Sequence, residues 1–237
     1  MIRALIVDDE FHAREELGAI LAETGEFTVA GKCANALDAM KFIRKERPDV
    51  VFLDIQMPVI DGFEFLGMIE EEILPHVVFV TAYDTYALKA FDENAVDYLL
   101  KPVEKDRLSK TIVRLKKNID DGRRPAVASS PEIKRVPCIV CNRIKLVNVS
   151  DIEYVRSGQA GIHVVCPSGE FYTELTLKIF ESRTDLVRCH KQYLVNLNQV
   201  DEIIFHDSSQ AEIKTKTSRR IPVSRRYLKL LKEQLAF

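Results

Sequence analysis

The chain has 237 residues, of which 46% are hydrophobic and 30% are charged, and its formal net charge is −2. This length is sufficient for two domains with separate hydrophobic cores. No run approaches the roughly 20 apolar residues that a membrane-spanning helix needs, and the first residues lack the basic and apolar regions of a signal peptide. Composition therefore argues against a membrane or secreted protein, and we expect a cytoplasmic location with no membrane partner.

The net charge hides a difference between the two halves of the chain. Residues 1–132 contain 17 basic and 25 acidic residues, a net charge of −8, whereas residues 133–237 contain 17 basic and 11 acidic residues, a net charge of +6. Residues 121–132 contain glycine, proline and serine without apolar periodicity, which is typical of a flexible linker. We predict an acidic domain over residues 1–120, this linker, and a basic domain over residues 133–237.

Cysteine usage indicates reduced thiols, because the five cysteines are an odd number in a chain with no secretory features. Cys138 and Cys141 have the CxxC spacing of metal and redox sites, but no second pair accompanies them. They also lie in an apolar run, which argues against a metal or redox site.

Apolar runs in the first half alternate with amphipathic stretches, and they cover residues 2–7, 27–30, 50–53, 77–80 and 96–100. This alternation predicts five βα units and an α/β fold with a parallel sheet. Ligands of such sheets bind beyond the carboxyl ends of the strands. Polar residues follow four of these runs, namely Asp8, Asp9, Asp54, Thr81 and Lys101. We therefore expect these side chains to converge at one edge of the sheet.

Three carboxylates at one edge repel one another unless a pKa shifts or a cation joins them. Mg²⁺ suits a site made of oxygen ligands. A metal ion, a lysine and a hydroxyl together can neutralise and position a phosphoryl group during its transfer. Asp54 could itself be the nucleophile. Each residue also has an ordinary interpretation, since Asp8 or Asp9 could cap the next helix and Asp54 and Lys101 could be turn residues. Their joint spacing favours the phosphoryl site.

Residues 7–10, 52–58, 61–62, 81–82 and 98–102 read VDDE, FLDIQMP, DG, TA and YLLKP. These segments resemble the receiver domain of response regulators, over about residues 1–120. The resemblance implies a flavodoxin-like fold, a five-stranded parallel sheet flanked by helices, in which Asp54 accepts a phosphoryl group from a sensor histidine kinase. It implies that Mg²⁺ is held by Asp9, Asp54 and the Gln56 carbonyl, with Asp8 acting through water. Lys101 would pair with the phosphoryl group, Thr81 and Tyr98 would act as the switch, and the bond between Lys101 and Pro102 would be cis.

In the second half, apolar and polar residues alternate over residues 143–146, 151–154, 161–164 and 212–214. This alternation predicts half-buried antiparallel strands. Short helical patterns surround Leu177 and Phe180 and, at the end of the chain, Tyr227 to Leu235. Residues 213–232 contain eight basic residues and no acidic residue. Such a stripe repels itself unless a polyanion such as a phosphate backbone meets it, although a solvated basic surface is an alternative.

Residues 186–196 read LVRCHKQYLVN and residues 221–227 read IPVSRRY. These segments resemble the two signatures of LytTR output domains, over about residues 133–237. The resemblance implies a mostly-β domain whose loops enter successive major grooves of double-stranded promoter DNA. The implied contact residues are Ser157, Gln159, Arg188, His190, Lys191, Ser224, Arg225 and Arg226. Arg225 can read guanine with two hydrogen bonds, Lys191 could reach a guanine edge or a phosphate, and His190 could instead be a structural hydrogen-bonding residue.

The two domains would communicate through the face formed by residues 84–119. Leu108, Ile112, Leu115 and Ile119 form a stripe that could pack on its own sheet or form a dimer seam. Receivers commonly pair through this face when phosphorylated, so the resemblance favours a homodimer, which would raise DNA occupancy. The chain is then expected to be no enzyme beyond its own phosphotransfer and dephosphorylation.

Two rival functions remain open. A phosphohydrolase with Asp54 as nucleophile would need a second aspartate two positions later, where Gln56 stands. A receiver with a protein-binding or RNA-binding output is the other rival, but RNA readers usually expose aromatic platforms, and the basic run contains only Tyr227.

Overall fold

The computed structural model describes residues 1–83, 95–122, 132–141, 143–206 and 210–235. The chain divides into two compact units, Met1–Pro131 and Glu132–Phe237. The division falls at the end of the segment predicted as a linker, most of which (residues 123–131) lies outside the described residues. Within the described part of the chain, no helix is long and apolar enough to cross a membrane.

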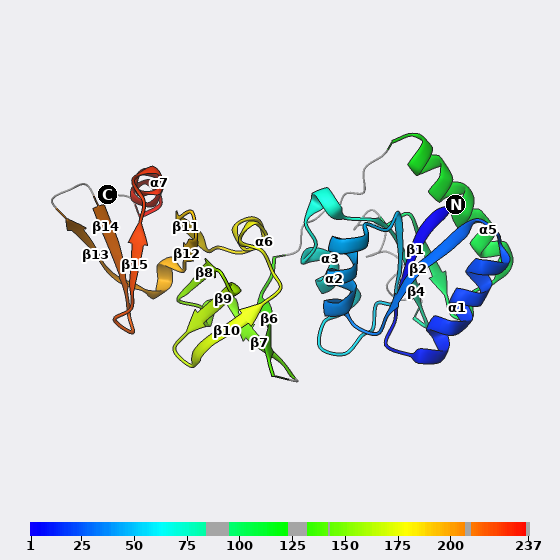
Figure 1. Ribbon diagram of the computed structural model, residues 1–237, viewed down its shortest axis with the longest axis horizontal. Coiled ribbons are helices and arrows are strands. Elements are labelled where there is room, and N and C mark those ends of the chain that lie inside the picture. Colours follow the sequence, from blue (N-terminus) through cyan, green and yellow to red (C-terminus); the bar gives the residue numbers. More distant parts are fainter. Residues whose placement is uncertain (84–94, 123–131, 142, 207–209, 236–237) are drawn as a thin grey trace. The chain divides into compact units, whose positions relative to one another are not determined.

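The first unit contains a five-stranded parallel sheet with strand order β2-β1-β3-β4-β5, which confirms the predicted α/β fold. Its strands are β1 (Ile2–Val7), β2 (Phe27–Cys33), β3 (Val50–Leu53), β4 (His76–Thr81) and β5 (Asp97–Leu100). Its helices are α1 (Phe11–Glu23), α2 (Ala36–Glu46), α3 (Gly62–Gly67), the 3₁₀ helix η1 (Glu71–Ile73) and α5 (Lys105–Asp120). In Figure 1, α1 and α5 cover one face of the sheet, and α2 and α3 cover the other. The strand order reverses beside β1, so the crevice beyond β1 and β3 is where such folds bind ligands.

The apolar stripe of α5 packs on its own sheet. Leu108, Ile112 and Leu115 are at most 9% exposed and belong to the core cluster that contains β1, β3 and β4. Ile119 is 37% exposed. Of the two alternatives for this stripe, core packing therefore holds for three of its four residues, and these three are not available as a dimer seam. Residues 84–94, which belong to the same predicted face, lie outside the described residues.

The aspartates at the end of β1 do not cap α1, so this alternative interpretation was wrong. The N-cap of α1 is Glu10, which makes no side-chain capping bond. The Asp8 carboxylate instead accepts a hydrogen bond from the Glu10 amide (2.9 Å), which holds it at the edge of the sheet. By contrast, Asn35 caps α2, and Asp61 forms a capping box with Glu64 at the start of α3.

Val59 lies in the loop between β3 and α3 with a backbone φ of 74°, which crowds a β-branched side chain. The Ile60 amide donates to the Pro58 carbonyl (2.9 Å), so Val59 is the centre of a γ-turn. Replacing Val59 by glycine is expected to raise the free energy of unfolding by about 1 kcal/mol, because the relief of strain exceeds the added freedom of the unfolded chain. Urea unfolding measures this change. Val59→Ala, which keeps a Cβ at positive φ, should gain less, and a glycine variant no more stable than the parent would contradict the prediction.

The second unit is mostly β, as predicted, with two antiparallel sheets of strand orders β11-β12-β8-β9-β10-β6-β7 and β13-β14-β15. The strands of the larger sheet are β6 (Arg135–Val140), β7 (Arg143–Asn148), β8 (Tyr154–Gly158), β9 (Gly161–Cys166), β10 (Gly169–Thr173), β11 (Val187–His190) and β12 (Tyr193–Val195). The remaining elements are η2 (Val149–Asp151), α6 (Leu177–Arg183), η3 (Leu197–Gln199), β13 (Val200–His206), β14 (Gln210–Thr215), β15 (Arg220–Val223) and α7 (Arg225–Leu235).

One predicted strand of this unit starts late. Asp151 belongs to the 3₁₀ helix η2, and β8 begins only at Tyr154. In a half-buried strand the polar Glu153 would face solvent, whereas Glu153 is fully buried and its carboxylate makes polar contacts instead. Its carboxylate accepts hydrogen bonds from Thr215 (3.0 Å) and Thr217 (2.8 Å), which lie at the β14–β15 hairpin.

Candidate functional site

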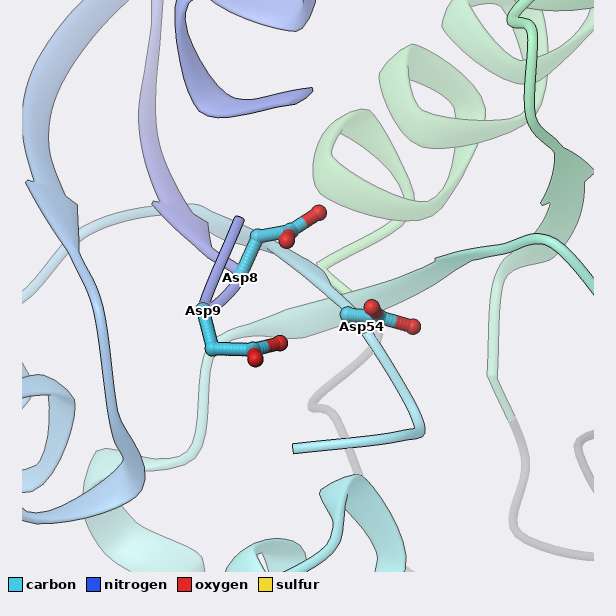
Figure 2. Close-up of side chains that lie close together, drawn as sticks. All are labelled: Asp8, Asp9 and Asp54. Atoms are coloured by element: carbon cyan, nitrogen blue, oxygen red, sulfur yellow. The ribbon is translucent and has the colours of Figure 1, made fainter. Parts of the chain in front are cut away.

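Three aspartates of the first unit converge beyond the carboxyl ends of β1 and β3, as predicted from the strand pattern. Figure 2 shows Asp8 and Asp9 after β1 and Asp54 after β3, with the Asp9 side chain directed toward Asp54. Each residue offers a carboxylate oxygen, and these oxygens lie within 4.8 Å of one another. The backbone fits closely here, because a Cβ at position 62 would lie 2.6 Å from the Asp54 carbonyl oxygen, so only Gly62 is tolerated.

Lys101 is the cation of this cluster. Its Nζ lies 2.6 Å from Asp8 Oδ2 and 3.0 Å from Asp54 Oδ2, and the peptide bond between Lys101 and Pro102 is cis, as predicted. Burial alone lowers the pKa of Lys101, but the hydrogen bonds to Asp8 and Asp54 outweigh burial and raise it. Burial, together with the neighbouring Asp54 charge, raises the pKa of Asp8. One ammonium thus leaves an excess of negative charge that a further cation would neutralise.

An open pocket of about 500 Å³ lies over this cluster and is lined also by Gln56, Thr81 and Lys101. The Gln56 amide donates to Asp54 Oδ1 (3.3 Å). The Thr81 side chain is fully buried, and its hydroxyl has no hydrogen-bond partner among the described residues. A buried hydroxyl without a partner carries a free-energy cost, so a ligand oxygen in the pocket would satisfy it.

Tyr98 connects the loop after β4 to strand β5. Its side chain is buried, and its hydroxyl donates to the Tyr83 carbonyl, two residues after Thr81. Its amide donates to the Asp97 carboxylate (2.9 Å), and its carbonyl accepts from Arg107 (3.1 Å). No pattern in the sequence indicated Asp97 or Arg107, because their contact depends on how α5 packs beside β5. Tyr98 is therefore held at both its side chain and its backbone.

Three segments of the second unit that carry predicted DNA contacts lie next to one another. The Ser157 amide donates to the Gln192 carbonyl (2.8 Å), which joins the end of β8 to the β11–β12 turn. The Ser224 amide donates to the Cys189 carbonyl (3.0 Å), which joins the start of α7 to β11. Four of the predicted contact residues on these segments are exposed, namely Gln159, Lys191, Arg225 and Arg226.

Two further predicted contact residues, Arg188 and His190, lie on β11 and form hydrogen bonds or ion pairs within the protein. The Arg188 side chain is only 12% exposed and forms an ion pair with Glu181 (2.7 Å). His190 Nδ1 accepts a hydrogen bond from the Gln192 amide (3.2 Å), and burial together with Lys191 lowers the pKa of His190. His190 therefore makes a structural hydrogen bond through Nδ1, and a DNA contact by the rest of its side chain stays a prediction.

The basic run is not a stripe of one sign in space, so this part of the prediction was wrong. Lys214 pairs with Glu202 (2.6 Å) and Asp201 (3.5 Å), and Arg220 pairs with Glu212 (3.5 Å). The acidic partners of Lys214 come from β13, which is antiparallel to β14 with Glu202 opposite Lys214. The self-repulsion argument considered only neighbours along the chain, whereas β-sheet pairing brings in acidic residues from outside the run.

The CxxC segment does not form a metal site. Cys138 is buried in β6, where burial raises its pKa to about 12, whereas Cys141 is exposed beyond the end of that strand. All five cysteines are free. In the portion of the chain that the structure describes, the cluster of Asp8, Asp9 and Asp54 is the group of potential metal ligands.

Comparisons with known proteins also find two domains, one in each compact unit of the chain. The protein-family model of the response regulator receiver domain matches residues 4–113. The family model of the LytTr DNA-binding domain matches residues 142–236. An uncharacterized response regulatory protein of Vibrio cholerae is 48% identical over the whole length of both chains. A second such protein, from Shewanella oneidensis, is 46% identical, also over both whole chains.

A relative with a functional name is the transcriptional regulatory protein BtsR of Escherichia coli K12, which is 47% identical over 99% of each chain. Identity at this level over the full length, together with the two domain matches and the two observed folds, leads to one conclusion. The chain belongs to the response regulators that join a receiver domain to a LytTR DNA-binding domain, and it is a transcriptional regulator.

Proposed function

We propose that this protein accepts a phosphoryl group on Asp54 from a sensor histidine kinase and, as a phosphorylation-promoted homodimer, binds promoter DNA. In the transfer, a carboxylate oxygen of Asp54 forms a bond to phosphorus as the bond from phosphorus to the kinase histidine nitrogen breaks. The observation that carries the proposal is the arrangement around Asp54, where Lys101 lies at 3.0 Å and the buried Thr81 hydroxyl lines the same pocket without a partner.

Mg²⁺ fits the donor set of this site. The cluster offers only oxygen ligands, which Mg²⁺ prefers, and its excess negative charge is not balanced by Lys101 alone. Asp9, Asp54 and the Gln56 carbonyl would hold the ion, with Asp8 acting through water. When bound, the ion neutralises charge on the phosphoryl oxygens. Lys101 adds a second positive charge on the side of Asp8 and Asp54.

The proposed switch runs from Thr81 to Tyr98. A phosphoryl oxygen on Asp54 would accept a hydrogen bond from the Thr81 hydroxyl and draw the β4–β5 side of the pocket toward Asp54. Tyr83 follows Thr81 closely in the chain, and its carbonyl accepts from the Tyr98 hydroxyl, so the displacement is transmitted to β5. Dimer formation would then use the solvent side of β5 and α5, where Leu100 is 45% and Val113 is 68% exposed.

The proposed DNA contacts centre on the start of α7. Arg225 and Arg226 occupy the first turn of this helix, and no acidic residue is present there. Positive side chains are unfavourable at a helix N-terminus, where the helix dipole is itself positive. An anion such as a DNA phosphate relieves this repulsion. Lys191, Gln159 and Ser157 complete the proposed surface from the adjoining β11–β12 and β8–β9 turns.

Selection of genomic fragments tests the proposal as a whole. The purified full chain is incubated with Mg²⁺ and fragments of the source genome, with and without beryllofluoride as a phosphoryl mimic, and the retained fragments are sequenced. We expect a few promoters that share a duplex motif, with stronger enrichment in the presence of the mimic. Retention of all fragments, unchanged by the mimic and lost in moderate salt, would contradict it.

Replacing Thr81 by valine separates the stability of the receiver from its response. Valine has nearly the same shape and removes the buried hydroxyl that lacks a partner, so thermal stability without phosphodonor should be equal to or greater than that of the parent. The beryllofluoride-induced gain in DNA affinity should fall because the proposed contact with the phosphoryl oxygens is lost. Fluorescence anisotropy with a selected duplex measures the gain. A Thr81→Val chain that is less stable yet responds fully would show the opposite role for this hydroxyl.

A further inference from the structure

The β11–β12 turn departs from the usual geometry of a two-residue hairpin. His190 pairs with Tyr193, so Lys191 and Gln192 form a two-residue connection. Two-residue hairpins usually adopt turns with positive φ, for which asparagine and glycine are preferred. Neither Lys191 nor Gln192 has a positive φ, and the pairing is irregular between Arg188 and His190. The turn thus lacks the backbone twist by which positive-φ turns match their flanking strands, and hydrogen bonds from neighbouring residues hold it instead.

Three hydrogen bonds hold the backbone of the turn. Arg188 Nη1 donates to the Lys191 carbonyl (3.2 Å), and the Gln192 amide donates to His190 Nδ1 (3.2 Å). The Ser157 amide donates to the Gln192 carbonyl (2.8 Å). The side chains of Lys191 and Gln192 stay exposed, so these bonds orient the turn without occupying its outer surface.

Glu181 in turn fixes the Arg188 side chain. Its Oε2 accepts from Arg188 Nε (3.2 Å) and Nη2 (2.7 Å), while Nη1 reaches the turn. Glu181 belongs to α6, which is anchored in the core by Ile179 and Phe180, at 2% and 0% exposure. A guanidinium has a rigid planar fork of donors, so locking one side on α6 determines where the other side lies.

We infer that Arg188 and Glu181 are a positioning pair, which sets the β11–β12 turn so that Lys191 meets DNA, and that Arg188 does not itself contact DNA. The inference rests on the proposed function, because it assumes that Lys191 is a contact residue. It gives Glu181, an acidic residue beside a DNA-binding surface, a favourable role in DNA binding. Simple electrostatics gives Glu181 the opposite role, because a carboxylate repels phosphates.

The Glu181→Gln variant tests this difference in sign. Removing a negative charge should strengthen DNA binding if Glu181 is only a charge, whereas loss of the positioning pair should weaken it about tenfold for the selected duplex. Glu212→Gln is the matched control, because Glu212 also pairs with an arginine, Arg220, but neither residue touches the turn. Its affinity should equal or slightly exceed that of the parent.

Arg188→Lys provides the second arm, since lysine keeps the charge but loses the fork. A phosphate contact would largely survive this change, whereas a positioning role predicts the same loss as Glu181→Gln and no further loss in the double variant. Amide hydrogen exchange at Gln192 should accelerate, with an unchanged melting temperature showing that the domain is folded.

The outcomes separate the two levels of the proposal. Glu181→Gln with parental or tighter DNA affinity, or Arg188→Lys with parental affinity, overturns the positioning role. Lys191→Gln reports on the underlying assumption, because equal binding of this variant and the parent removes Lys191 from the contact surface. Loss of affinity in Lys191→Gln together with parental affinity in Glu181→Gln would leave the proposed function intact and reject the positioning pair alone.

Discussion

Replacing Asp54 by asparagine is expected to abolish the response of DNA binding to a phosphodonor, while leaving the basal affinity for DNA close to that of the parent. Asparagine keeps the volume of the side chain but removes the oxygen nucleophile and one negative ligand of the proposed Mg²⁺ site. Anisotropy with a selected duplex, with and without acetyl phosphate, measures the response. Sedimentation of the same samples measures the dimer, which should form only in the phosphorylated parent.

Asp120→Asn is the matched control for this experiment, because it makes the same chemical change at an exposed position at the end of α5. This variant should respond as the parent does. Equal activation of Asp54→Asn and the parent by acetyl phosphate would reject Asp54 as the acceptor. Loss of both basal and stimulated binding in Asp54→Asn would instead mean that the two units depend on this residue for folding, which the melting temperature reports directly.

Replacing Asp97 by asparagine is expected to lower the free energy of unfolding on the order of 3 kcal/mol, because it breaks a buried charge cluster. The Asp97 side chain is 0% exposed and accepts hydrogen bonds from Arg107, Thr111 (2.7 Å) and Arg114 (2.9 Å). After substitution, the two arginines lose their shared counter-charge. The cost is at the lower end for such clusters because Arg107 and Arg114 are 35% and 52% exposed and can be hydrated.

The effect of Asp97→Asn should depend on pH with a definite sign. Burial alone raises the pKa of Asp97, but hydrogen bonds from Arg107 and Thr111 outweigh it, so the pKa lies below its ordinary value. A lowered folded-state pKa means that the stabilisation is complete above the unfolded-state pKa and is lost as the pH falls through the folded-state pKa. Urea unfolding of parent and variant should therefore differ most near neutral pH and converge in acid.

Glu23→Gln is the matched control, because it removes the carboxylate of an exposed ion pair instead of a buried one. Glu23 pairs with Lys105 at 2.7 Å, but the two side chains are 61% and 76% exposed, and exposed ion pairs contribute little to stability. Its unfolding curve should nearly overlie that of the parent at every pH. A difference between parent and Asp97→Asn that grows as the pH falls would contradict the assignment of a lowered pKa to Asp97.

The receiver site was largely predictable from sequence because its determinants are local. Each strand was marked by its own apolar run, and β1 and β3 have the bounds expected from the runs at residues 2–7 and 50–53. Residues that follow parallel strands must share one edge of the sheet. The convergence of Asp8, Asp54 and Lys101 therefore follows from topology, and their distances of 2.6 and 3.0 Å refine it.

What only the tertiary structure decided is which charged and polar groups are already engaged. The sequence did not indicate that Glu181 of α6 pairs with Arg188, or that Glu202 of β13 lies opposite Lys214. In the same way, no pattern along the chain indicates that the Thr81 hydroxyl lacks a partner among the described residues, or that Asp97 forms a buried cluster. The physical reason is that hydrophobic periodicity reflects local backbone geometry, whereas ion pairs and buried hydrogen bonds depend on strand register and helix packing between residues distant in sequence.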